Sequence, residues 1–247
     1  MKANELSTID SYSKLQDWLD DYCSSRQYEC WHKYGPADYE KYRSEPVKIL
    51  LINSESWGYA GCGAVPPDEY LKWIKDRWNT PRYGALLVAL IRDYISQIGA
   101  GRKDPPYDHD RMQNWYQDDN ILIESMRPTI YMNTRITSND TGESKEDQEG
   151  VMADSAEFLS YRKRFVEILK PRIIICAGDS AKQLMLSDGG VFPEIAIPGP
   201  IFNSNEMVFM ITQHLSRPNL FGGYCGLHEI ALNCASVFCS FNQSTRS

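Results

Sequence analysis

Three apolar runs of this sequence end in side chains that could do chemistry. Glu55 follows the run KILLIN, Asn133 lies in TIYMNT, and His214 ends MVFMITQH. A carboxylate can orient water, an amide can donate and accept hydrogen bonds, and an imidazole can donate to an oxygen that gains negative charge. These residue types could together form a hydrolytic site that works through water and hydrogen bonds.

The positions of these residues depend on the elements that carry them. Short apolar runs alternate with amphipathic segments, which predicts a parallel sheet covered by helices on both faces. The predicted strands lie at 47–53, 129–134, 191–197 and 207–214 and in RIIICA before Gly178. The predicted helices lie at 8–23, 84–98, 155–169 and 225–241, with others starting at Pro66-Pro67 and after Gly178, and loops are expected at 99–118 and 137–150.

A parallel sheet brings the carboxyl ends of its strands to one edge, where open α/β folds bind their ligands. We therefore expect Glu55, Asn133 and His214 to converge there, although they lie far apart in the sequence.

Composition limits the choice of function. The 247 residues suit a single domain, and the net charge of −7 argues against non-specific nucleic-acid binding over the whole surface, although a local groove is compatible with it. The sequence shows no apolar run long enough to cross a membrane and no leader segment, and its seven cysteines form no CxxC pair. We expect a cytoplasmic monomer that does not bind membranes and whose cysteines are mostly free thiols.

The three polar strand ends resemble the motifs of the uracil-DNA glycosylase superfamily. NSESW stands where that superfamily has patterns such as GQDPY, YMNTRIT is similar to LLNxxLT, and HLSRPN is similar to HPSP. RIIICAGDSAKQL also resembles its penultimate strand and helix. Glu55 replaces the usual Asp or Asn, and Leu215 replaces the proline after the histidine.

The resemblance implies a fold and a domain layout. The fold is a three-layer α/β/α arrangement around a central, mostly parallel four-stranded sheet. The single domain 1–247 would comprise an N-terminal helical extension (1–46), a glycosylase-like core (47–220) and a C-terminal helix (221–247).

The resemblance also implies roles for individual residues. Glu55 would orient water and stabilise a cationic sugar, His214 would donate to the departing base, and Asn133 would read the base edge. The other expected substrate-binding residues shape the base site, enter the gap in the base stack or hold phosphates: Trp57, Tyr59, Arg217, Asn219, Ser54, Ser56 and Ser216. No metal or organic cofactor is required.

Structural roles compete with each of these functional ones. Glu55 would alternatively cap a turn, Asn133 would form a strand-end turn, and His214 would be a structural hydrogen-bonding group. Trp57 and Tyr59 would alternatively belong to the core or its rim.

The sequence therefore leaves three functions open. The first is a divergent DNA glycosylase that cleaves the N-glycosidic bond of a deaminated or modified, uracil-like base flipped out of single- or double-stranded DNA. The second is a catalytically inactive protein of the same fold that binds nucleic acid, a nucleotide or a protein. The third is an unrelated α/β hydrolase of nucleosides or esters, and the absence of a G-x-S-x-G motif disfavours the ester version.

Overall fold

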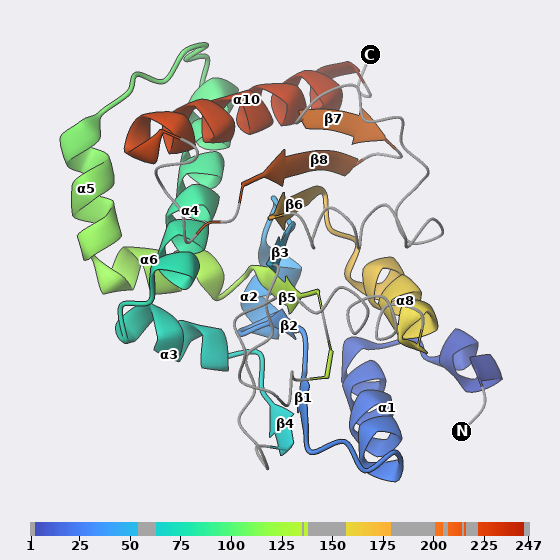
Figure 1. The fold of residues 1–247 in the computed structure, drawn as a ribbon. Coiled ribbons are helices and arrows are strands. Elements are labelled where there is room, and N and C mark those ends of the chain that lie inside the picture. The colour runs from blue at the N-terminus through green and yellow to red at the C-terminus, as the bar shows by residue number, and fades with distance from the viewer. Residues whose placement is uncertain are drawn as a thin grey trace.

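The protein is a three-layer α/β/α structure, with a mostly parallel sheet between two layers of helices (Figure 1). The computed structural model describes residues 3–53, 63–134, 136–137, 157–178, 201–204, 207–213, 215 and 222–244. The strands are β1 (Cys30–His32), β2 (Gly35–Pro36), β3 (Ile49–Asn53), β4 (Gly63–Val65), β5 (Ile130–Asn133), β6 (Ile173–Ala177), β7 (Ile201–Ser204) and β8 (Met207–Thr212). The helices are η1 (Ala3–Thr8), α1 (Tyr12–Ser25), α2 (Tyr39–Ser44), α3 (Glu69–Lys75), α4 (Asn79–Gly99), α5 (His109–Gln117), α6 (Asp119–Met126), α8 (Leu159–Leu169) and α10 (Gly223–Ser244).

The main sheet has the strand order β2-β5-β3-β6-β8-β7 in the described part of the chain. β5, β3, β6 and β8 run parallel to one another, while β2 and β7 are antiparallel edge strands. The register pairs Asn53 with both Asn133 and Ala177, and Ala177 with Thr212. The last residues of all four parallel strands therefore lie in one row across the sheet.

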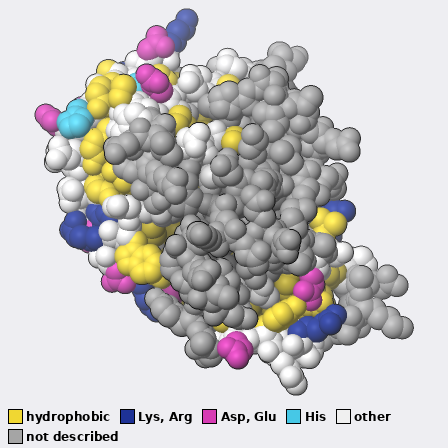
Figure 2. All heavy atoms as spheres, in the orientation of Figure 1, with side chains coloured by type: hydrophobic (Ala, Val, Ile, Leu, Met, Phe, Trp, Pro, Cys, Tyr) yellow, Lys and Arg dark blue, Asp and Glu magenta, His cyan; other side chains and the backbone are white. Residues whose placement is uncertain are grey.

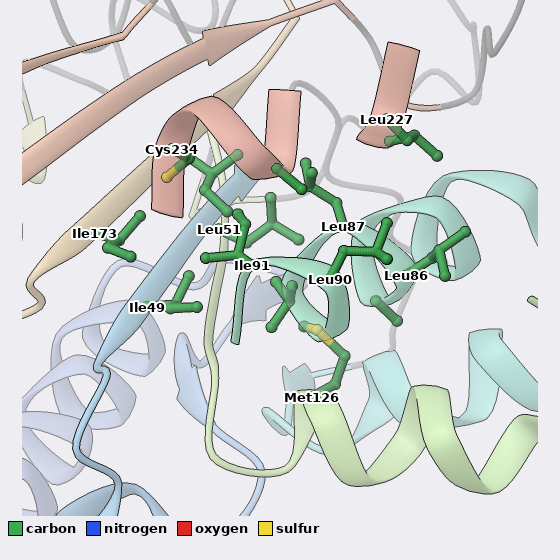
Figure 3. Packing of buried hydrophobic residues seen from close by; sticks show 14 of the residues in the cluster. Ile49, Leu51, Leu86, Leu87, Leu90, Ile91, Met126, Ile173, Leu227 and Cys234 are labelled. Carbon is green, nitrogen blue, oxygen red and sulfur yellow. The ribbon is translucent and has the colours of Figure 1, made fainter. Parts of the chain in front are cut away.

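The parallel strands form because their side chains are apolar on both faces. Ile49 and Leu51 of β3 face a core covered by α3, α4, α6 and α10, whereas Leu50 and Ile52 face a second core covered by α1 and α8. Figure 3 shows the first core, in which Leu87 and Ile91 of α4 pack beside β3. Complete burial of such side chains stabilises the fold by about 1.5–3 kcal/mol each.

Aspartates fix where two of the helices on the first face begin. The Asp108 side chain accepts a hydrogen bond of 2.9 Å from the backbone N–H of Arg111 and caps α5. Asp118 caps α6 in the same way, accepting from the backbone N–H of Asn120 at 2.9 Å. Each such cap contributes about 1 kcal/mol.

The structure confirms most of the predicted elements and corrects others. The predicted four-stranded parallel core is present, but two antiparallel edge strands extend the sheet. Residues 99–118, predicted as a loop, contain α5, whose side chains are mostly polar and whose buried side chain is that of Met112. The strand predicted at 191–197, the helix predicted after Gly178 and nearly all of the loop predicted at 137–150 lie outside the described residues.

The N-terminal extension is not purely helical, because residues 1–46 contain β1 and β2. β2 adds to the edge of the sheet beside β5, where Gly35 and Pro36 pair with Tyr131 and Ile130. A two-residue strand is held by pairing across the sheet and has no sequence period of its own. The expectation of free cysteines also has an exception, since Cys30 in β1 is disulfide-bonded.

The described part of the surface offers few large apolar side chains. Trp78 and Tyr107 are the exposed large hydrophobic residues of the described part. Figure 2 shows hydrophobic side chains along the α5 and α3 side of one face. Among the described residues, no helix combines the length and the apolarity that a membrane crossing requires.

Candidate functional site

The parallel strands end in a row of mostly polar side chains, here called the carboxyl-edge row: Asn133 of β5, Asn53 of β3, Ala177 of β6 and Thr212 of β8. Alternation along each strand places this row on the face that also carries Leu51 and α4. The row is neutral and buried, with Asn53 and Asn133 exposing 2% and 1% of their surface. Hydrogen-bonding side chains therefore occupy buried positions at this edge of the sheet. In open α/β folds, this is the edge that binds ligands.

A tyrosine hydroxyl joins the two asparagines. Tyr131 precedes Asn133 by two residues on the same face of β5, and its Oη donates to Asn133 Oδ1 at 2.7 Å. The same Oη accepts a longer hydrogen bond, of 3.4 Å, from Asn53 Nδ2. The Asn133 amide therefore points its oxygen toward Tyr131, and the Asn53 amide points its nitrogen toward Tyr131.

Three polar atoms of the row have no hydrogen-bond partner although they are buried. They are Asn53 Oδ1, Asn133 Nδ2 and Thr212 Oγ1. Leaving such a group unsatisfied costs about 1–3 kcal/mol, so native structures rarely contain several of them close together. These three atoms give the row hydrogen-bonding capacity that the surrounding protein does not use.

The close approach of α4 to β3 supports this row. A Cβ on Gly84 would lie 2.9 Å from Leu51 Cδ2 and 2.8 Å from Tyr70 Oη, so only glycine fits without a shift. Tyr70 donates to the Pro81 carbonyl at 3.1 Å and packs against the Tyr131 ring, with centroids 3.8 Å apart. Burial raises the pKa of Tyr70 well above 10.

The N-terminal extension braces the chain beside this edge. β1 pairs in parallel with β4, which is the first element after the segment that leaves β3. The backbone N–H of His32 also donates to the carbonyl of Ile136 at 2.8 Å, three residues beyond Asn133. β1 therefore hydrogen-bonds both to β4, which follows β3, and to Ile136, which follows β5.

The structure describes one of the predicted site residues. Asn133 lies where predicted, at the carboxyl end of β5 and in register with the strand that precedes Glu55. The remaining predicted residues lie outside the described part of the chain: Ser54, Glu55, Ser56, Trp57, Tyr59, His214, Ser216, Arg217 and Asn219. Leu215, which follows His214, is fully buried in the first core.

Sequence reasoning missed three residues of the row and its support: Asn53, Tyr131 and Thr212. The predicted strands 47–53, 129–134 and 207–214 contain them, but no role of their own is predicted for them. The period of two along a strand is the signal that finds them, because it places Tyr131 on the same face as Asn133 and Asn53 on the same face as Leu51.

The described residues contain no group of three or more His, Cys, Asp or Glu side chains that could hold a metal ion. In the acidic segment 107–110, Asp108 caps α5. The chemistry available at the row itself is hydrogen bonding by amide and hydroxyl groups. Comparison of the chain with protein-family models finds no match, and comparison with curated proteins finds none either.

Proposed function

We propose that this chain is an N-glycosidic hydrolase that removes a deaminated or modified base flipped out of DNA. The observation that carries the proposal is the unpartnered Nδ2 of Asn133, 99% buried at the end of a central parallel strand. An amide in that place can donate to a carbonyl oxygen of a base, as the resemblance to the uracil-DNA glycosylase superfamily implies. The α/β/α architecture and its four parallel strands support the same fold assignment.

The proposed reaction adds water across the bond between the sugar and the base. The oxygen of water bonds to the anomeric carbon while the N-glycosidic bond breaks, and the electron pair of that bond leaves with the base. Glu55 orients the water and stabilises positive charge on the sugar. His214 donates a hydrogen bond to the base oxygen that gains negative charge. The departing base then takes up a proton derived from water.

A binding protein that lacks catalytic activity is the second candidate. The net charge of −7 favours it, because most proteins that hold DNA present clustered Lys and Arg side chains. In this case the row would hold a nucleic acid, a nucleotide or a protein group without cleaving it. Glu55→Gln separates the two functions, since it abolishes hydrolysis and leaves simple binding largely intact.

Base release from DNA tests the proposal. Labelled single- and double-stranded oligonucleotides carry uracil, hypoxanthine or an oxidised pyrimidine, and alkali converts each site of base loss into a strand break. Release that disappears in Glu55→Gln and His214→Ala, and that persists in the control Gln213→Ala at an exposed neighbour of His214, supports the hydrolase. Release from none of these substrates would contradict it.

A further inference from the structure

One carboxylate of α1, that of Asp20, is bound from two sides by β1 and the residue that follows it. Asp20 Oδ1 accepts a hydrogen bond of 2.9 Å from Trp31 Nε1, and Asp20 Oδ2 lies 2.6 Å from Lys33 Nζ. The Asp20 and Lys33 side chains are 33% and 23% exposed, so water screens this ion pair only in part. Each carboxylate oxygen therefore has a charge-assisted partner of its own.

This contact matters because β1 lies apart from the main sheet. β1 and β4 form a separate two-stranded sheet with three residues in each strand, which gives little stability by itself (Figure 1). α1, by contrast, is fixed to the second core by buried side chains such as Leu15 and Leu19. The Trp31 ring packs into the same core, and a disulfide holds Cys30 at the start of β1. Asp20 adds the contact that ties the far end of β1 to α1.

The backbone of β1 transmits this placement to two other parts of the chain. The N–H of Lys33 donates to the Val65 carbonyl at 2.8 Å, and the N–H of Gly63 donates to the Glu29 carbonyl at 2.9 Å. On its other side, β1 holds the carbonyl of Ile136. The strand that Asp20 anchors therefore contacts the chain beyond β3 and the chain beyond β5.

We propose that Asp20 is a positioning residue that sets the placement of the segment after β3, where Glu55 lies, and of the segment after β5, which ends in Asn133. The structure fixes both ends of the first segment, since Asn53 pairs within the main sheet and Gly63 pairs with β1. Fixed ends reduce the conformations that a segment must give up when a reaction geometry forms. That this reaction is base release rests on the proposed function.

Hydrogen exchange of single backbone amides, followed by NMR, tests the anchor without DNA. In Asp20→Ala, the N–H groups of Gly63 and Lys33 should exchange at least tenfold faster, because local opening no longer breaks the contacts of the carboxylate. A thiol reductant is present throughout, so that the disulfide of Cys30 does not hold β1 by itself. Asp21→Ala is the matched control, because it removes the same charge from an exposed position of α1.

Two results would overturn the anchor. Exchange at Gly63 and Lys33 that is equally fast in Asp20→Ala and in Asp21→Ala would show that the carboxylate does not hold β1. An equal acceleration of exchange in β3 and β6 would show that Asp20 supports the whole fold and not the placement of one strand. Acceleration confined to β1 and its partners supports the proposal.

Base release then shows whether this placement matters for the reaction. Under single-turnover conditions, Asp20→Ala should release the base at least tenfold more slowly with unchanged affinity for DNA, because a positioning residue affects the reaction geometry and not the contacts with DNA. A rate equal to that of the unaltered chain would overturn the positioning role and leave the hydrolase in place. Faster exchange at Gly63, together with no base release by the unaltered chain, would remove the hydrolase and leave the anchor in place.

A second variant keeps the test decisive where Asp20→Ala fails to fold. Lys33→Met keeps most of the length of the side chain and removes the ammonium group that Asp20 binds at 2.6 Å. The N–H of Gly63 should again exchange faster than in Asp21→Ala. Unchanged exchange in folded Lys33→Met would overturn the anchor.

Discussion

Thr212→Val is expected to stabilise the protein, although it deletes a buried polar group. Thr212 Oγ1 has no hydrogen-bond partner, and the residue is 8% exposed. Valine keeps the β-branched shape that suits a strand and removes the unsatisfied hydroxyl. Since an unsatisfied buried group costs about 1–3 kcal/mol, we expect a gain of about 1–2 kcal/mol, and thus a rise in Tm of about 2–8 °C for a chain of this size.

Thr129→Val provides the matched control. Thr129 is also buried, with 1% of its surface exposed, but its Oγ1 donates to the Ser125 carbonyl at 2.8 Å. Its replacement should lower stability by about 1 kcal/mol, so the two threonines should respond with opposite signs. Urea unfolding followed by circular dichroism measures both. A loss of stability in Thr212→Val as large as that in Thr129→Val would refute the reasoning, because it would show that the hydroxyl has a partner in solution.

Three further changes test how the fold positions the row. Gly84→Ala should destabilise by about 1 kcal/mol in urea unfolding, since the clash with Leu51 outweighs the gain in helix propensity; Gly99→Ala, in open space on the same helix, should not. Arg82→Met should cost about 2–3 kcal/mol in the same assay, because the buried guanidinium hydrogen-bonds two backbone carbonyls and Asp119; an unchanged midpoint would contradict this. Burial holds the pKa of His228 below 6.5, so the unfolded state binds more protons and stability should fall as the pH drops below 6.5. His228→Phe should flatten that fall between pH 7 and 5, and an equally steep fall would show that other groups cause it.

The strands that build the sheet could be predicted because fully buried parallel strands read as continuous apolar runs. β3, β5, β6 and β8 each carry such a run, and their polar ends indicated the edge where the row lies. α5 could not be predicted in this way, because it buries Met112 and little else. β2 has two residues, and its pairing with β5 is a tertiary effect that leaves no periodic signal.

The candidate site was predictable in outline and not in detail. Asn133 was identified from its place after an apolar run. Its link to Asn53 through Tyr131 depends on which strands are neighbours and on their register, and the sequence alone does not specify either. The lack of partners at Asn53 Oδ1 and Asn133 Nδ2 is likewise a property of packing, visible only when the surrounding atoms are placed.

Base release from an oligonucleotide that contains a single uracil or hypoxanthine, measured for the unaltered chain and for Glu55→Gln, tests the central claim most directly. The proposed function predicts alkali-sensitive breaks at the modified position with the unaltered chain and none with Glu55→Gln. The same breaks in both proteins, or none in either at protein concentrations above that of the DNA, would contradict it.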